Sequence, residues 1–146
     1  MTLGERHVRG YVRVVGENKA RTYTYPMHEM AVTQSILDIA LDHAARNGAA
    51  RVTSLNLLIG QLSSIVDDSV QFYWDILSRD TLCEGAVLFF QRLPARLACL
   101  DCQYEYELSR GLEACPRCES FRVRVISGDE FRLESIEIEE SPQLAA

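Results

Sequence analysis

The sequence lacks any long hydrophobic run. None of its 146 residues belongs to a stretch that approaches the roughly 20 apolar residues of a membrane span, and the polar N-terminus lacks the apolar centre of a secretory signal peptide. We therefore expect a cytoplasmic protein with no membrane partner. Because the cytosol keeps thiols reduced, the five cysteines are expected to bind metal or to remain free, and not to form disulfides.

The sequence also lacks the motifs of several catalytic sites. It contains no glycine-rich phosphate-binding loop, no G-x-S-x-G motif and only three histidines, which are too few for a catalytic zinc site. Hydrolase and transferase chemistry therefore finds no support in the residues. With 47% apolar residues the chain can still form a folded core, and its length suits one compact domain with a small satellite.

Basic residues are scarce outside the N-terminal segment. Residues 1–26 carry a net charge of +3, whereas residues 27–146 carry −9. An acidic protein repels a phosphate backbone, so the charge argues against a nucleic-acid partner. The N-terminal segment has no apolar face large enough to dock firmly, and an isolated hairpin formed by it would be marginal in water.

Hydrophobic periodicity predicts the order of helices and strands in the rest of the chain. The expected elements are a helix over 30–47, a strand over 52–60, a helix with Asp67 as its N-cap, a buried strand over 86–91 and a last strand after Ser127-Gly128-Asp129. In the last strand, the apolar residues change phase. This change predicts either that both faces are buried or that a bulge lies near Glu134 and Ser135.

The element order predicts an α+β fold, with a small mixed sheet, two helices and an inserted zinc-ribbon lobe of β-hairpins. The last strand is expected to return to the first sheet. The expected divisions are an upstream extension (1–26), an α+β domain (27–94 and 128–140), a metal-binding lobe (95–127) and a tail (141–146).

Four of the five cysteines form two C-x2-C motifs. Cys99 and Cys102 make the first, Cys115 and Cys118 the second, and 12 residues separate the two. Two such turns on facing hairpins can enclose one ion in a tetrahedron of thiolates, which is typical of structural Zn²⁺. With four thiolates and no open position, the site is expected to be structural, not catalytic. Iron in the same cage is the alternative, and it would indicate a rubredoxin-like electron carrier.

Two other side chains of metal-binding type receive structural interpretations. Cys83 stands apart in a loop, where we expect a small, partly buried hydrophobic residue. His43 lies on the apolar stripe of the first helix with Val32, Ile36 and Ile39, so we expect an interior or boundary histidine. His7, inside the upstream segment, is assigned no role.

The triplet Met27-His28-Glu29 precedes the first helix and allows two readings. A free α-amine, the next backbone amides and an imidazole can surround Ni²⁺ or Cu²⁺ in a plane, but only if Met27 is the first residue. Taken alone, the triplet is better explained as a helix start, because an acidic residue there complements the helix dipole.

The wider pattern changes that preference. The triplet, "IGQLSSIVDDSV", "TLCEGAVLFF", the paired C-x2-C motifs and "SGDEFRLESIEIEE" follow one another in the chain. From Met27 to about Glu140 the sequence resembles the HypA/HybF family of hydrogenase nickel-insertion proteins.

The resemblance implies a nickel metallochaperone that is not an enzyme and serves [NiFe]-hydrogenase maturation, with urease as a second client in some members. It implies nickel ligands on Met27 (amine), His28 (amide and imidazole) and Glu29 (amide), and zinc on the four paired cysteines. The implied partners are a nickel-insertion GTPase and the precursor of the hydrogenase large subunit, and the implied state is a monomer or weak homodimer.

The sequence departs from the family pattern at its start. Residues 1–26 precede the triplet and would turn the Met27 amine into a peptide amide. We expect the upstream residues to reflect a wrongly chosen start codon and not to belong to the working protein; removal after synthesis and a true addition are the alternatives.

Two further functions remain open besides the iron carrier and the nickel chaperone. A zinc ribbon can bind nucleic acid or another protein. Residues 95–127, however, hold five arginines and five acidic residues, so they offer no basic surface for nucleic acid.

Overall fold

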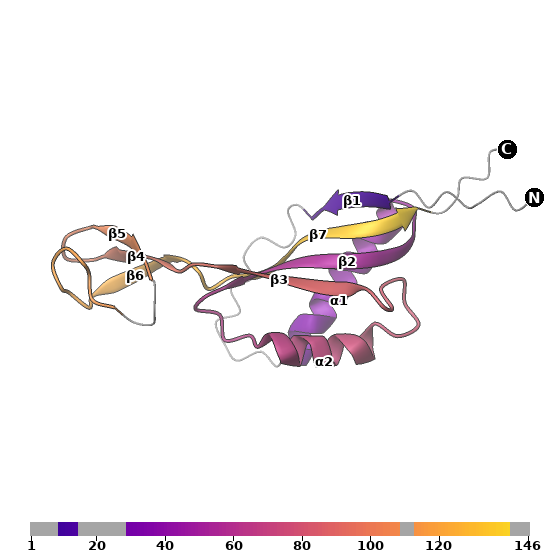
Figure 1. The fold of residues 1–146 in the computed structure, drawn as a ribbon, viewed down its shortest axis with the longest axis horizontal. Coiled ribbons are helices and arrows are strands. Elements are labelled where there is room, and N and C mark those ends of the chain that lie inside the picture. The colour runs from indigo at the N-terminus through magenta and orange to yellow at the C-terminus, as the bar shows by residue number, and fades with distance from the viewer. Residues whose placement is uncertain (1–8, 15–28, 109–112, 141–146) are drawn as a thin grey trace, which may run out of the picture.

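The computed structural model describes residues 9–14, 29–108 and 113–140. It has an elongated shape, with a larger sheet-and-helix part at one end of the long axis and a smaller lobe at the other (Figure 1). In chain order, the elements are β1 (Arg9–Arg13), α1 (Glu29–Arg46), β2 (Ala49–Gly60), α2 (Asp67–Leu77), β3 (Val87–Leu93), β4 (Arg96–Cys99), β5 (Glu105–Glu107), β6 (Val123–Ser127) and β7 (Phe131–Glu140).

The larger part is built on a mixed four-stranded sheet with the strand order β1-β7-β2-β3. β2 and β3 are parallel and are joined through α2, while β7 runs antiparallel to β2. The last strand therefore returns to the first sheet, and the predicted α+β class with two helices is confirmed. The inner face of the sheet and the two helices enclose one hydrophobic core.

Helix α1 follows the sequence prediction closely. Its apolar positions recur every three or four residues and form one buried stripe that contains Val32, Ile36, Ala40 and His43. The Nδ1 atom of His43 lies 3.1 Å from the carbonyl oxygen of Ile39 one turn earlier. The prediction of an interior histidine at this position is confirmed.

Helix α2 begins differently from the prediction. Val66, not Asp67, is the N-cap residue, and no side chain caps the helix. Asp67 is the first helical residue, and its carboxylate instead pairs with the guanidinium of Arg92 on β3. Asp67 thus still places negative charge at the positive end of the helix dipole. The buried face of α2 includes Val70 and Trp74, as its periodicity predicts.

Strand β7 contains the predicted bulge. Asn56 pairs with Ser135 and the next residue of β2, Leu57, pairs with Leu133, so Glu134 is the extra residue. The extra residue reverses the side-chain alternation, because side chains on a strand repeat every second residue. As a result, both Leu133 and Ile136 point into the core.

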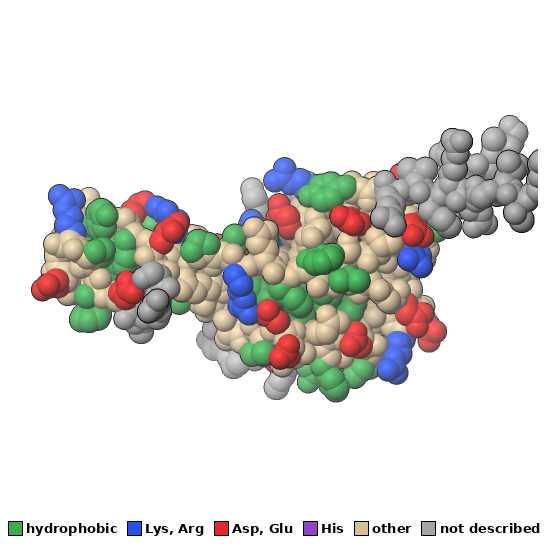
Figure 2. Space-filling view, in the orientation of Figure 1, with side chains coloured by type: hydrophobic (Ala, Val, Ile, Leu, Met, Phe, Trp, Pro, Cys, Tyr) green, Lys and Arg blue, Asp and Glu red, His purple; other side chains and the backbone are tan. Residues whose placement is uncertain are grey.

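Strand β3 is less buried than predicted. It lies at the edge of the sheet, and only its inner face packs on the core through Leu88 and Phe90. Val87 and Phe89 point to the other face and are 52% and 54% exposed. Figure 2 views the molecule in the orientation of Figure 1, with green hydrophobic side chains visible on the larger part among tan and charged surface. The apolar run at 86–91, predicted to be a buried strand, is therefore an edge strand with one solvent-exposed face.

Part of the upstream segment joins the sheet. Strand β1 pairs antiparallel with β7 in an unbroken register from Arg9 opposite Glu139 to Arg13 opposite Ser135. Val14 is 8% exposed and belongs to the core. The expectation that the segment has no face able to dock is therefore wrong for these residues. The sheet edge supplies the hydrogen bonds and apolar surface that the segment lacks alone.

The smaller lobe is a three-stranded antiparallel sheet with the order β5-β4-β6. Its core is small. The buried residues of this cluster are Ala95, Leu97, Cys99, Tyr106, Leu108 and Cys115.

A tight junction connects the two parts. The side-chain oxygen Oε1 of Gln61 accepts a hydrogen bond from the backbone N–H of Ala95 at 2.9 Å. The backbone N–H of Leu62 donates to the carbonyl of Gly128 at 2.7 Å. A Cβ atom on Gly60 would lie 2.0 Å from the same carbonyl oxygen, so only glycine allows this approach. The end of β2 thus holds both chain segments that lead to and from the lobe.

Candidate metal centre

The four paired cysteines meet at the far end of the smaller lobe. Their sulfur atoms all lie within 4.8 Å of one another. The Sγ atoms of Cys99 and Cys118 are 3.5 Å apart, and those of Cys102 and Cys115 are 3.6 Å apart. Tetrahedral zinc with Zn–S bonds of about 2.3 Å places its sulfurs about 3.8 Å apart. The cluster therefore fits one tetrahedral ion.

Each C-x2-C motif forms the same local turn. The backbone N–H of Gln103 donates to the carbonyl of Cys99 at 2.9 Å, and the N–H of Glu119 donates to that of Cys115 at 2.8 Å. Gln103 and Glu119 both have a left-handed backbone, with φ of 63°. Each turn brings the two sulfurs of its motif to the same side. Sequence reasoning missed these two residues, although both stand four positions after the first cysteine of a pair.

Side chains around the cysteines tie the two turns together. Asp101, inside the first motif, accepts hydrogen bonds from the hydroxyl of Ser120 and from Arg122, the latter at 3.0 Å. Ser120 and Arg122 lie just after the second motif. One carboxylate thus joins the two halves of the site, a role that the spacing of cysteines does not reveal.

The pKa values of the cysteine thiols differ from one another. Backbone N–H groups of Cys102 and Asp101 directed at the Cys99 sulfur lower the pKa of that thiol to about 7. For Cys118, the N–H of Ser120 lowers the pKa, but the neighbouring Cys99 sulfur and burial raise it more, to about 12. The pKa of Cys102 is also raised. Four thiolates this close repel one another, so a divalent cation is needed for all of them to ionise together.

Of the predicted nickel residues, the structure describes Glu29 at the start of α1. Glu29 is the first residue of the helix, and its carbonyl accepts a hydrogen bond from the hydroxyl of Thr33 at 2.6 Å. Met27 and His28 lie outside the described residues, as does His7. The structure therefore places only the third residue of the predicted triplet.

The fifth cysteine has no part in the metal centre. Cys83 is fully buried in the core of the larger part, where burial raises the pKa of its thiol to about 12. A protonated, inaccessible thiol is inert. The prediction that Cys83 is a small hydrophobic residue agrees with this position.

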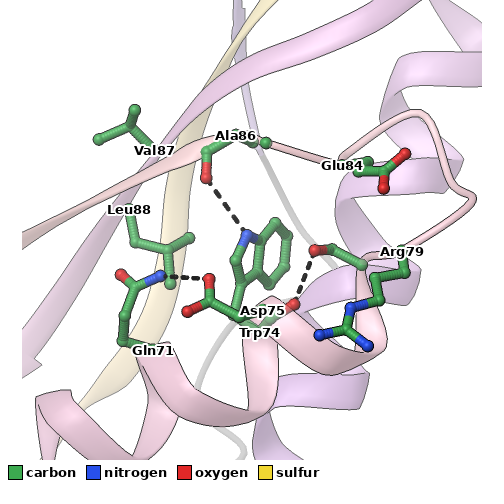
Figure 3. A pocket seen from close by; sticks show the side chains of 10 residues that line it. Gln71, Trp74, Asp75, Arg79, Glu84, Ala86, Val87 and Leu88 are labelled. Atoms are coloured by element: carbon green, nitrogen blue, oxygen red, sulfur yellow. Dashed lines mark hydrogen bonds between the residues drawn. The ribbon is translucent and has the colours of Figure 1, made fainter.

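A groove of about 390 Å³ separates α2 from the start of β3 (Figure 3). The indole Nε1 of Trp74 donates to the carbonyl of Ala86 at 3.3 Å, and Gln71 donates to Asp75 at 2.9 Å. No cysteine or histidine lines the groove within the part of the chain that the structure describes. The Ser78 hydroxyl in the groove donates to the carbonyl of Trp74 at 2.6 Å, so its proton is directed at the backbone and not at a base.

Within the same described ranges, no helix is long and apolar enough to cross a membrane.

Comparison with known proteins gives one consistent result. A family described as "Hydrogenase/urease nickel incorporation, metallochaperone, hypA" matches residues 27–138. The hydrogenase maturation factor HypA of Geotalea uraniireducens is 42% identical over 113 residues, which cover 77% of this chain and 100% of the relative. That of Dehalococcoides mccartyi is 38% identical over 117 residues, or 80% of this chain and 98% of the relative.

A solved structure shares the fold. The solution structure of the Ni metallochaperone HypA from Helicobacter pylori matches with a TM-score of 0.60 and 26% identity, over 79% of this chain and 100% of that one. The family match begins at Met27 and includes the four cysteines that meet in the smaller lobe. The chain belongs to the HypA family of nickel-incorporation metallochaperones for hydrogenase and urease.

Proposed function

We propose that this protein binds one Ni²⁺ ion at the Met27-His28-Glu29 triplet and delivers it during maturation of [NiFe]-hydrogenase. The observation that carries this proposal is the start of the family match at Met27, directly before α1. The proposed ligands are the Met27 amine, the backbone amides of His28 and Glu29, and the His28 imidazole. Four nitrogens in a plane suit Ni²⁺ and disfavour tetrahedral Zn²⁺.

We further propose that Cys99, Cys102, Cys115 and Cys118 hold a structural Zn²⁺ ion. Sulfur separations of 3.5 and 3.6 Å within the two closest pairs support a closed tetrahedral cage. On this proposal residues 95–127 form a zinc-binding lobe, and residues 27–94 with 128–140 form the nickel-binding domain. Iron would fit the same thiolates, so metal analysis of the purified protein decides between zinc and an electron-carrying iron centre.

The proposed partners are the proteins that would receive the nickel ion from this chain. They are a nickel-insertion GTPase and the precursor of the hydrogenase large subunit, with urease as an alternative client. We propose that the protein acts in the cytoplasm, is not itself an enzyme, and works as a monomer or weak homodimer. The net charge of −9 over residues 27–146 supports a protein partner and not a nucleic acid.

A nickel titration tests the metal assignment. Protein beginning at Met27 and the full chain are compared, both loaded with zinc, and a His28→Ala variant of the shorter form is the matched control. We expect about one nickel as a yellow, low-spin planar site in the shorter form only, and its loss in the control. Equal binding by both lengths would remove the Met27 amine from the ligand set. Absence of binding by either would contradict the nickel proposal.

A further inference from the structure

The outer edge of β7 is occupied by a strand that lies outside the family match. Residues 9–13 pair with β7, and the match begins only at Met27. We propose that this edge is a binding site for a basic extended peptide with a small residue followed by two β-branched residues at alternate positions, and that residues 9–14 fill it as an intramolecular strand able to dissociate. The proposal does not depend on the metal sites, and it applies to any form of the chain that carries residues 9–14.

The backbone of β7 provides the first part of the site. Five consecutive residues of β1 stand opposite β7 without a shift in register. One residue beyond β1, the N–H of Val14 donates to the carbonyl of Glu134 at 2.9 Å. Glu134 is the bulge residue, so the bulge that turns Leu133 and Ile136 inward also directs a carbonyl to the docked segment. Strand addition of this kind gives affinity through main-chain bonds.

Inward-facing side chains give the site its shape. Val12 and Val14 both pack on the hydrophobic core. At Gly10 the fit is close, since a Cβ atom there would lie 3.2 Å from Cγ1 of Ile138. The edge therefore selects a small residue followed by two β-branched residues at alternate positions.

Charge favours a basic strand. Strand β7 carries Glu134, Glu137 and Glu139, with Glu139 opposite Arg9 and Glu137 opposite Tyr11 in the register. Glu139 also pairs with Arg51 of β2 at 3.1 Å. The Nε atom of Arg13 lies 3.9 Å from Oε1 of Glu134. Over longer range, the segment 1–26 has a net charge of +3 and the remainder −9. Opposite charge on strand and edge speeds association and fixes the register.

The docked strand is expected to exchange. Among the described strands, β1 is the terminal strand of the sheet and pairs only with β7. A short strand held on one side opens locally at a lower free energy than the centre of a sheet. Its release bares a row of backbone N–H and C=O groups on β7, which is the kind of edge that captures another extended chain.

Amide hydrogen exchange on the full zinc-loaded chain tests the proposal. The Val14→Asp variant places a charge where the side chain is 8% exposed, and Tyr11→Ser at a 64% exposed position is its matched control. We expect β7 amides to exchange at least tenfold faster in Val14→Asp and to be unchanged in Tyr11→Ser, because losing one buried valine contact is worth about a factor of ten or more. The amides of β2 report that the domain stays folded.

The same variant tests recognition in trans. A synthetic peptide of residues 7–16 is titrated into Val14→Asp, and we expect saturable binding that restores β7 protection. A peptide with Val12→Lys and Val14→Lys is expected not to bind. Should Val14→Asp unfold, Gly10→Val is the second variant, since its side chain meets Ile138 and displaces only the edge strand. Equal exchange of β7 in wild type and variant, or no peptide binding to a folded variant, overturns the proposal.

Discussion

The larger part and the smaller lobe of the molecule are each stabilised by a different kind of interaction. In the larger part, twenty of the described residues form one buried cluster around the sheet and both helices. In the smaller lobe the corresponding cluster has six, and two of these are cysteines of the proposed zinc site. An apolar core of that size does not compensate the entropy lost on ordering a chain. The larger part is therefore stabilised by apolar burial, whereas the smaller lobe depends on metal binding by its cysteines.

Loss of bound zinc should have the largest effect of the changes considered, and it should act on the smaller lobe alone. We expect Cys115→Ser, or chelation of zinc, to unfold residues 95–127 while the larger part stays folded, since binding of structural zinc contributes on the order of 10 kcal/mol. Separate NMR signals for the two parts measure this. Cys83→Ala is the control, because Cys83 lies outside the cluster and alanine buries no polar group in its place. Simultaneous loss of both parts in Cys115→Ser would contradict independent stabilisation.

Creating a cavity in the larger part should destabilise that part and leave the metal binding of the smaller lobe unchanged. Trp74 is 1% exposed, and Trp74→Ala should lower the free energy of unfolding by about 3–5 kcal/mol. Phe72 on the same helix is 61% exposed, so Phe72→Ala should change it by less than about 0.5 kcal/mol. Chemical denaturation measures both values. Zinc content should be unchanged in either variant if the lobe folds on its own metal.

The zinc affinity of the smaller lobe should depend on pH, because its cysteine thiols must lose protons to bind the metal. The raised pKa values of Cys102 and Cys118 keep both thiols protonated near pH 8 without metal, so zinc binding releases at least two protons. Zinc affinity should therefore fall at least a hundredfold for each pH unit lost, and more steeply below about pH 7, where Cys99 also takes up a proton. Competition with a chromophoric chelator at several pH values measures the slope. A slope below two protons would contradict these acidities.

Removing the Asp101 link between the two cysteine turns should have the smallest effect on zinc binding. Asp101 is paired with Ser120 and Arg122, and the Asp101 and Arg122 side chains are 40% and 73% exposed. Such exposed pairs are worth about 1 kcal/mol or less, so Asp101→Asn should speed zinc release by less than about tenfold. A control at Glu107, which pairs with Arg96 at the end of β4 opposite Cys99, should leave the rate unchanged.

Much of this fold could be predicted because local patterns agreed with the final packing. The stripe of α1, the cysteine spacing and the phase change in β7 each depend on residues close in sequence. The α+β class followed from them, and the bulge at Glu134 explains how both halves of β7 reach one core.

Other features depended on partners distant in sequence. Asp67 could cap α2, but Arg92 at the end of β3 takes its carboxylate. Residues 9–14 pair, within the part of the chain that the structure describes, with β7, which lies more than 100 residues later in the sequence. The exposure of Phe89 depends on the position of β3 at the sheet edge, which its apolar run does not reveal.

The junction at Gly60, Gln61 and Gly128 has a mechanical consequence. The segments that lead to and from the lobe are both hydrogen-bonded to residues directly after β2, so the position of the lobe depends on this one strand end. Cys99, the first residue of the cysteine cluster, is the last residue of β4, at the end of that strand opposite the junction. A change in the position of the β2 terminus would therefore displace the cysteine cluster as well, with the length of β4 as the lever arm.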